Sequence, residues 1–204
     1  MNRNEIAGLT LSNLGQNIPI SDFKLDNSLA AKIINQWWRL SLLDFLSKHP
    51  WNFATSYSAL PMGLSEPSAG YSQSYAKPSD ALVIRRLAPH GRFPKKETQE
   101  ELHRRWREVN VGTGTEIWCD VQDAHAEYTV AVGDDYDFPF HFAKGFSYHL
   151  ALMIGPKLIT QNWPKIVGTI MPMYKAEIDS SIATDLALQP DAVESDSTFI
   201  TVRR

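Results

Sequence analysis

The chain has 204 residues with a formal net charge of -3 at pH 7, and 43% of its residues are hydrophobic. This length and composition suit one folded domain with a sizeable core. The small net charge excludes a global attraction to DNA or to anionic membranes, and the single cysteine, Cys119, excludes an internal disulfide. The sequence shows neither the apolar core of a signal peptide nor a run of the ~18 apolar residues that cross a bilayer. We therefore expect a cytosolic product in a reducing compartment.

Two helices are predicted in the first fifty residues. Asn4–Leu14 has an apolar side and a plausible stop at Gly15. A longer helix is predicted over Asp26–His49, with Asp26 or Asn27 as its cap. Two apolar stripes follow the longer helix, one made of Leu29, Ile33, Trp37, Leu40 and Leu43 and one made of Ile34, Trp38, Leu42 and Phe45. A helix that is apolar on two sides is buried by more than one neighbour, which belongs to its own chain, to other subunits, or to both.

The segment that follows the longer helix joins helical to β structure. Pro50 lacks an amide hydrogen and clashes with the preceding turn, so the helix must stop near His49. Trp51 and Phe53 then place two large apolar rings at the joint, and rings of that size dominate local burial. We expect Pro50, Trp51 and Phe53 to form a rigid structural joint, which suits a building block better than an enzyme.

The middle of the chain has the pattern of short strands. Pro61–Gly70, rich in proline, glycine and serine, is predicted to be an exposed loop after an extended run over Phe53–Leu60. Pro78–Ile84 is predicted to be a turn that leads into a strand. Glu116–Val121 and Ala126–Val132 are the clearest strand candidates, and Gln122–His125 fits a hairpin turn between them.

A long charged segment, Arg85–Asn110, lacks apolar periodicity and is predicted to be a loop that binds something or orders on assembly. Its possible contact residues are Arg85, Arg86, Arg92, Arg104, Arg105 and Arg107. Such a run is usually a solvated surface whose charges pair internally. The functional alternative is a loop that contacts acidic protein or nucleic acid, although interspersed glutamates argue against a dedicated phosphate track.

The helical pattern returns near Phe140 and is interrupted at Gly155-Pro156, where a kink or break is expected. A last helix is predicted to start at the cap Asn162 and to reach about Leu188, with a bend at Pro172. Its apolar stripe recurs every four residues, at Ile166, Ile170, Tyr174, Ile178, Ile182 and Leu186. The tail after Pro190 has no core-forming pattern, and its last residues have strand propensity.

Sites for chemistry are weakly indicated. Asp134–Asp137 lacks the glycine and the distal glutamate of a calcium loop, and the six histidines and Cys119 show no zinc-ligand spacing. Gly112–Thr115 has no Gly-Lys-Ser/Thr after it and is a poor phosphate loop. His149 is predicted to be a satisfied core histidine. We therefore expect no metal, no cofactor and no catalytic residue.

Taken in order, these segments resemble a known family, tail tubular protein A, the head-to-tail adaptor of short-tailed bacteriophages. The similar features are Leu14-Gly15 before Ile18-Pro19-Ile20, the Pro50-Trp51-Asn52-Phe53-Ala54 joint, and Tyr75-x-x-Pro78-x-Asp80-x-Leu82. A β insert and a late pair of helices follow, so the resemblance covers roughly Glu5–Leu188.

The resemblance implies a structural virion protein, assembled in the host cytoplasm, that forms a ring in the tail or neck. Such a ring, usually of twelve copies, joins the portal protein to the tail nozzle protein and passes DNA through its channel without sequence-specific binding. In related adaptors the C-terminal segment docks onto the portal. Here the residues chemically suited to docking are Phe199, Ile200, Val202, Arg203 and Arg204.

The fold class expected from these patterns is α+β, mainly α. We expect a single domain over 1–204, in which an antiparallel bundle of two N-terminal and two C-terminal helices (1–50 and 140–188) carries an irregular β insert (51–139) and an extended tail (189–204). Two other functions stay open. One is nucleic-acid binding by the basic 85–107 loop, and the other is polymer hydrolysis with carboxylates such as Asp134 and Asp137.

Overall fold

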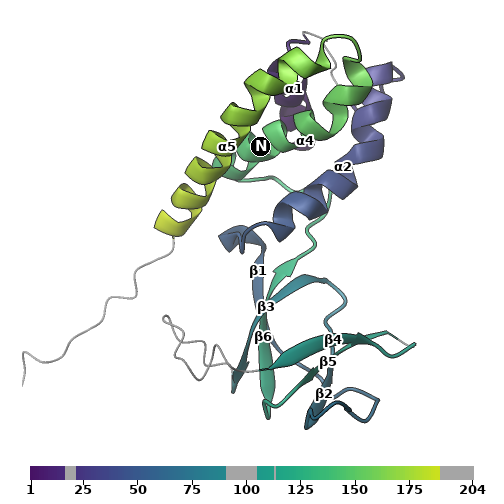
Figure 1. The fold of residues 1–204 in the computed structure, drawn as a ribbon, viewed down its shortest axis with the longest axis vertical. Coiled ribbons are helices and arrows are strands. Elements are labelled where there is room, and N and C mark those ends of the chain that lie inside the picture. The colour runs from purple at the N-terminus through teal and green to yellow at the C-terminus, as the bar shows by residue number, and fades with distance from the viewer. Residues whose placement is uncertain (17–21, 91–104, 113, 189–204) are drawn as a thin grey trace, which may run out of the picture.

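The chain folds into a helical part and a β part that meet at the end of its second helix (Figure 1). The computed structural model describes residues 1–16, 22–90, 105–112 and 114–188. Its helices are α1 (Arg3–Asn13), α2 (Leu29–Ser47), the short 3-10 helix η1 (Asn52–Ala54), α4 (Phe140–Leu158) and α5 (Trp163–Ala187). Its strands are β1 (Thr55–Ala59), β2 (Gln73–Ala76), β3 (Ala81–Pro89), β4 (Trp106–Asn110), β5 (Thr115–Cys119) and β6 (Ala124–Val130).

The helical part is organised around α4. Helices α1, α2 and α5 each pack against α4 (Figure 1). The predicted antiparallel bundle is therefore wrong, because the first and last helices do not take bundle positions and share α4 as a common support instead. The reason lies in α4 itself, whose buried residues, among them Phe142, Phe146 and Leu150, leave it little solvent-facing surface. A helix that is apolar nearly all round takes neighbours on several sides.

The strands between α2 and α4 form two three-stranded antiparallel sheets, in the orders β1-β6-β3 and β2-β5-β4. The insert is thus regular, and the predicted hairpin across Gln122–His125 is wrong, since β5 and β6 belong to different sheets. Asp123, at a φ of 47°, turns the chain between the sheets. Tyr75 of β2 holds the segment between β5 and β6, because its hydroxyl donates to the Val121 carbonyl at 2.9 Å.

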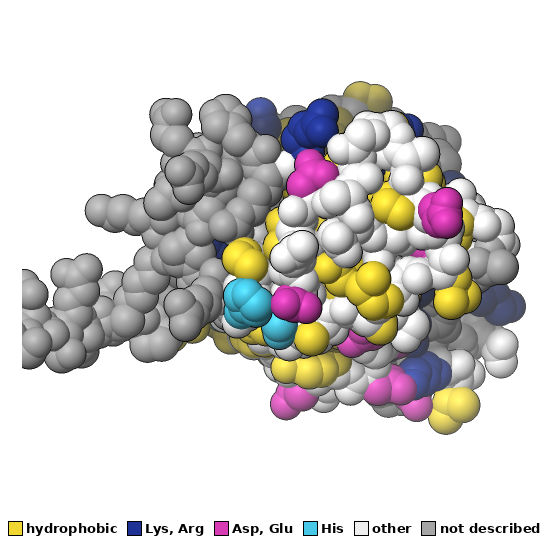
Figure 2. All heavy atoms as spheres, turned by 90° about the horizontal axis from the view of Figure 1, so that it is seen from below, with side chains coloured by type: hydrophobic (Ala, Val, Ile, Leu, Met, Phe, Trp, Pro, Cys, Tyr) yellow, Lys and Arg dark blue, Asp and Glu magenta, His cyan; other side chains and the backbone are white. Residues whose placement is uncertain are grey.

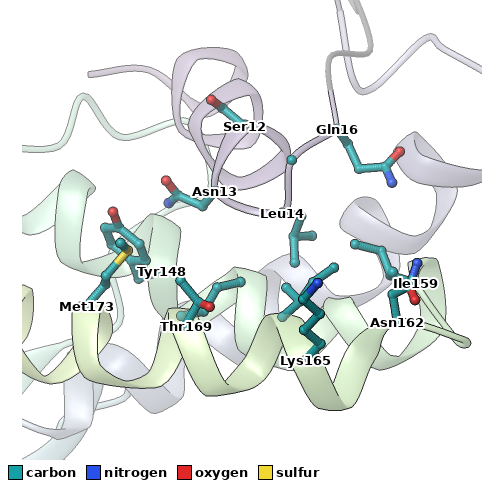
Figure 3. Close-up of a pocket in the computed structure, with 13 residues that line it drawn as sticks. Ser12, Asn13, Leu14, Gln16, Tyr148, Ile159, Asn162, Lys165, Thr169 and Met173 are labelled. Atoms are coloured by element: carbon teal, nitrogen blue, oxygen red, sulfur yellow. The ribbon is translucent and has the colours of Figure 1, made fainter.

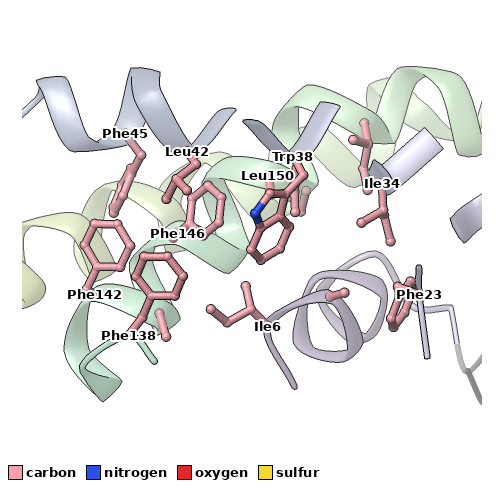
Figure 4. Close-up of a cluster of buried hydrophobic side chains, with 14 of the residues drawn as sticks. Ile6, Phe23, Ile34, Trp38, Leu42, Phe45, Phe138, Phe142, Phe146 and Leu150 are labelled. Carbon is pink, nitrogen blue, oxygen red and sulfur yellow. The ribbon is translucent and has the colours of Figure 1, made fainter. Parts of the chain in front are cut away.

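Two hydrophobic clusters hold the fold together. The larger joins the helices, with fully buried Trp38, Phe45, Phe142 and Phe146 (Figure 4). The smaller lies between the sheets and includes Cys119. Burial of these apolar surfaces is the main favourable term in the free energy of folding.

Several boundaries differ from the prediction. The N-cap of α2 is Ser28, whose hydroxyl accepts from the Ala31 amide at 3.2 Å, and neither Asp26 nor Asn27. The predicted loop over Arg85–Asn110 is wrong at both ends, because β3 runs to Pro89 and β4 begins at Trp106, while 91–104 lie outside the described residues. Helix α4 also continues through Gly155-Pro156 to Leu158.

The helix starts and stops follow local chemistry elsewhere. In α1, Asn2 forms a reciprocal capping pair with Glu5, as the side chain of each accepts from the other's backbone amide. Asn162 is the N-cap of α5 by position but makes no side-chain capping bond. None of the helices in the described part of the chain is long and apolar enough to cross a membrane.

Candidate functional site

The joint between α2 and β1 is buried in the helical core. Trp51 is fully buried, with its ring 5.5 Å from Phe45 in a stacked arrangement and 5.0 Å from Phe142 at nearly a right angle. Phe53 lies 4.8 Å from the same Phe142 ring. The Trp51 indole also donates to the Phe45 carbonyl at 3.3 Å. Both rings therefore contact α4, a helix that comes from a distant part of the sequence.

A buried carboxylate reaches this joint from the last turns of α5. Asp185 is 1% exposed, and its side chain accepts from the Asn52 amide at 3.1 Å. His49 and His141 each place Nε2 beside one of its oxygens, at 3.2 and 3.3 Å. The Asn52 side chain in turn donates to the Asp185 carbonyl at 2.5 Å. We call Asp185, His49, His141 and Asn52 the Asp185 cluster.

The Asp185 cluster joins three segments: the end of α2, the start of α4 and the end of α5. Ser181, one turn before Asp185, extends the connection because its hydroxyl donates to the His141 carbonyl at 2.7 Å. Burial lowers the pKa of His49, while its hydrogen bond to Asp185 acts in the opposite direction. A buried carboxylate that accepts several hydrogen bonds holds its donors together. Loss of one partner is therefore expected to lower the free energy of unfolding.

Arg85, expected to be a contact-loop residue, instead completes the joint from β3. Its Nη2 atom donates to the carbonyls of Ser47 and His49, at 2.9 and 3.2 Å, and its Nε donates to Thr129 Oγ1 at 2.9 Å. These carbonyls are at the C-terminal end of α2, where a helix leaves acceptors unsatisfied and favours a positive charge. Arg85 thus ties the first sheet to the helical part.

The other predicted contact residues are dispersed. Arg86 is ion-paired with Glu127 on the neighbouring strand, Arg105 lies over the Tyr71 ring and 3.7 Å from Asp120, and Arg107 is exposed on β4. Arg92 and Arg104 lie outside the described residues. The sheet end of the molecule shows only scattered blue side chains near its rim among the described residues (Figure 2).

A second buried carboxylate, Glu116 of β5, holds the Pro61–Gly70 loop. It accepts from the Ser74 hydroxyl at 2.7 Å, from the Leu64 amide at 2.8 Å and from the hydroxyl and amide of Ser65. These bonds, led by the Ser65 and Ser74 hydroxyls, hold the pKa of Glu116 at about 2. Leu64 itself is 91% exposed, so the loop is fixed from inside while its tip faces solvent.

The candidates for metal or acid chemistry do not converge. Asp134 lies 3.3 Å from Arg39 and Asp135 lies 2.5 Å from Lys24, whereas Asp137 is 85% exposed at its side chain. Among the residues that the structure describes, no group of three or more His, Cys, Asp or Glu side chains is placed to hold a metal ion. His149 is buried as expected, but it is not the satisfied histidine that was predicted: its Nε2 atom lies 3.0 Å from the Asp44 carboxylate without the geometry of a hydrogen bond.

A groove runs along the other end of the helical part. It has a volume of about 740 Å³ and lies between the end of α1, α4 and the first half of α5 (Figure 3). Leu14, Ile159 and Ile170 contribute apolar lining, and Lys165 is the charged side chain among the described lining residues. The predicted docking residues Phe199, Ile200, Val202, Arg203 and Arg204 lie outside the described residues.

Sequence reasoning found Trp51 and Phe53 but missed Asp185, His141, Asn52 and Glu116. One signal for Asp185 is present in the sequence. Ser181 and Asp185 are four residues apart and follow the Ile170 and Tyr174 face of α5, so two polar side chains continue an apolar stripe. Comparisons with protein-family models and with curated proteins found no match for this chain.

Proposed function

We propose that this chain is a structural virion protein, a head-to-tail adaptor whose copies pack side by side into a ring. The observation that carries the proposal is that two large apolar side chains of α2, Leu29 and Leu40, stay exposed although the helix already contributes to a full core. On α2, Ile34, Trp38 and Leu42 are fully buried, whereas Leu29 and Leu40 are 68% and 57% exposed. Ile33 and Trp37, of the same stripe as Leu29 and Leu40, are partly buried against the core. Large apolar side chains on one helix face mark a surface for another protein.

Helix α5 adds a second uncovered surface. Met171, Met173 and Leu186 are 39%, 50% and 50% exposed, and of the described elements α4 is the one that packs extensively against α5. Two different apolar surfaces on one molecule allow head-to-tail contacts between copies, and such contacts close into a ring when the rotation fits. Within this proposal the joint around Trp51 sets the angle between the helical part and the sheets.

The further details of the proposal come from the resemblance to tail tubular protein A. The ring has twelve copies, sits in the tail or neck of the virion, and contacts the portal protein on one side and the nozzle protein on the other. DNA passes through its channel without sequence-specific binding, and a net charge of -3 is compatible with that passage. The protein catalyses no reaction and uses no cofactor.

Nucleic-acid binding by the basic segment receives less support than the adaptor function. The guanidinium groups of Arg85 and Arg86 are engaged with the chain's own carbonyls and with Glu127. Contacts of that kind match the internally paired surface that such a charged run usually forms. The carboxylates Asp134 and Asp137 likewise show no shared geometry that favours a hydrolase.

The test of the proposed function is electron microscopy of the purified chain mixed with its portal protein. We expect closed rings on the portal for the wild type and for Gln36→Glu, which adds a charge at an exposed position of α2. Leu40→Glu should stay folded, because Leu40 is 57% exposed, but should form no ring. Absence of any complex between the wild type and portal under all conditions, or rings formed equally well by Leu40→Glu, would refute the proposal.

A further inference from the structure

The loop Pro61–Gly70 is held from inside the β part. Glu116 is 4% exposed and accepts from the Leu64 amide at 2.8 Å and from the Ser74 hydroxyl at 2.7 Å. The Gly63 amide donates to the Ser74 carbonyl at 2.8 Å, and a side chain at Gly63 would overlap the Ser74 hydroxyl. The loop backbone is therefore pressed against β2, and the loop takes its shape when the chain folds.

The tip of this loop displays apolar side chains to solvent. Met62 is 67% exposed and Leu64 is 91% exposed, so these two side chains contribute little to the burial that drives folding. An apolar side chain on a fixed backbone loses little conformational entropy when it binds. The tip thus has the character of an apolar anchor for another protein.

The charge of the loop limits the kind of partner. Pro61–Gly70 contains no Lys or Arg, and its one charged residue is the exposed Glu66. Nucleic acids and anionic lipid surfaces are bound through cationic side chains, and the described part of the sheet end has only scattered ones near its rim (Figure 2). The tip therefore fits an apolar pocket of a protein in which a cationic group faces Glu66.

The groove between α1, α4 and α5 has both of these properties. Leu14, Ile159 and Ile170 contribute its apolar lining, and Lys165 supplies an ammonium (Figure 3). Its volume of about 740 Å³ lies within the range of ~300–1,000 Å³ that is typical of ligand pockets. Neither Glu66 nor Lys165 has an ion-pair partner among the residues that the structure describes, so the two charges are available to each other.

The position of the loop decides which copy it meets. The loop is anchored to β2 and β5, in the sheet that lies furthest from the helices (Figure 1). The groove lies between helices, at the opposite end of the described fold. Because its backbone is fixed at the sheet end, the loop does not reach the groove of its own chain.

We propose that the Pro61–Gly70 loop of one copy docks into the groove of a second copy, with Met62 and Leu64 on the apolar lining and Glu66 beside Lys165. The inference rests on the proposed self-assembly and adds a contact between the β part of one copy and the helical part of the next. Loop and groove are different surfaces of one chain, so the contact is heterologous. Residues 189–204 are the competing occupant of the groove.

Sedimentation velocity of the full chain, without portal protein, tests this contact. All proteins carry Leu40→Glu, which removes the proposed ring contact, so the association that remains reports the loop and the groove. We expect the Leu40→Glu chain to associate reversibly. Adding Leu64→Ser should weaken the association about tenfold or more, because an apolar anchor is lost. Leu25→Ser makes the same change at a leucine that is 79% exposed outside the loop and the groove lining, and it should have no effect.

The anchoring carboxylate gives a second measurement in the same assay. Glu116→Gln changes no exposed atom of the tip but loosens the loop, so it should weaken the association about fivefold through the lost preorganisation. Glu108→Gln, on adjacent β4, is the matched control and should associate like the Leu40→Glu chain. Equal association of these two variants would contradict a role for the fixed shape of the loop.

Mixing two defective proteins tests the second-copy assignment. Thr169→Trp fills the groove at an exposed position and keeps the loop, whereas Leu64→Ser keeps the groove and lacks the anchor. Each alone should be a monomer, and the mixture should stop at a heterodimer because the loop and the groove left over are both defective. Glu66→Lys and Lys165→Glu should each weaken association about fivefold, and the two together should restore it. Lys175→Glu, at an exposed position outside the groove lining, should not restore it.

The inference would be overturned by a Leu40→Glu chain that does not associate, by equal association after Leu64→Ser, or by a mixture without heterodimer. It would also be overturned if changing Phe199, Ile200 and Val202 to serine abolished the association, since the groove would then belong to the chain end. Failure of these assays leaves the proposed ring intact, because that ring depends on Leu40 and is observed on the portal by electron microscopy.

Discussion

The Asp185 carboxylate and the His49 imidazole lie 136 residues apart in the sequence and 3.2 Å apart in the fold. His49 lies two residues after the end of α2, and Asp185 lies in the last turn of α5. Their contact holds the end of α5 against the segment that leads from α2 into β1. The orientation of α5, and of its exposed apolar residues, therefore depends on a polar contact as well as on packing.

Removing the Asp185 carboxylate should release the end of α5. Asp185→Ala leaves the Asn52 amide, the buried His49 imidazole and the half-buried His141 imidazole without their acceptor. We expect the free energy of unfolding to fall by about 3 kcal/mol, since a buried charged partner is lost. Urea denaturation followed by circular dichroism measures the change. Asp179→Ala, at an exposed position of the same helix, is the matched control and should stay within ~0.5 kcal/mol of the wild type.

The sequence predicted elements better than it predicted their partners. Pro50 dictates the end of α2 by sterics within one turn, so the joint could be located from the residues alone. The hairpin between β5 and β6 could not be excluded in that way, because each strand finds its partners far along the chain. The same limit applies to the bundle. Periodicity shows which face of a helix is buried and is silent on which helix covers it.

The candidate site was missed for a related reason. The stripe that runs from Ile166 to Leu186 repeats every four residues, whereas a turn has 3.6, so it drifts around the helix. At the end of α5 the drift leaves Leu186 50% exposed and gives the buried positions to Ser181 and Asp185. A charged residue near the end of a helix is usually exposed, so the spacing of Ser181 and Asp185 alone does not predict a buried carboxylate.

Trp51→Ala should impair folding of the joint. The indole contacts Phe45 and Phe142 and is fully buried, so its loss leaves a large cavity between α2 and α4. We expect a loss of about 3–5 kcal/mol in the free energy of unfolding, and fewer closed rings on the portal. Trp118→Ala makes the same substitution at a half-buried tryptophan of β5 and is the matched control. It should lower the free energy of unfolding by less. Equal losses in the two variants would contradict a special role for the joint.

Arg85 and Arg107 offer a test that separates structure from nucleic-acid contact. Arg85→Ala removes donors from the carbonyls at the end of α2 and should lower the free energy of unfolding by about 2 kcal/mol. Arg107→Ala, exposed on β4, should be neutral within ~0.5 kcal/mol. Duplex DNA titrated at low salt should bind both variants and the wild type equally weakly. A steep salt dependence that is lost in Arg107→Ala would instead favour the nucleic-acid alternative.

His149 should make the helical core sensitive to acid. Burial lowers its pKa from 6.5 to about 4, against the opposing attraction of Asp44, while Lys48 adds to the decrease. As the pH falls below 6.5, the unfolded chain takes up a proton that the folded chain resists, so stability drops until the pH reaches about 4. The difference amounts to roughly 3 kcal/mol on the scale of 1.36 kcal/mol per pKa unit. Urea titrations from pH 7 to pH 4 should show a smaller drop for His149→Leu, whereas His90→Asn, with a side chain that is 69% exposed in the wild type, should follow the wild type.

Glu116 should control the Pro61–Gly70 loop through its charge. Its folded pKa of about 2 is below the ordinary 4.5, so the stabilisation is complete above pH 4.5 and is lost as the pH falls toward 2. Glu116→Gln removes the charge at every pH, and it should loosen the loop because the Leu64 and Ser65 amides lose a charged acceptor. Limited proteolysis at neutral pH with thermolysin, which cleaves before large apolar residues, should then cut faster at the exposed Leu64. The control is Glu108→Gln, which removes a charge on adjacent β4 that pairs with Lys77 at 2.8 Å. A loop that is cut equally slowly in both variants would show that the buried carboxylate does not hold it.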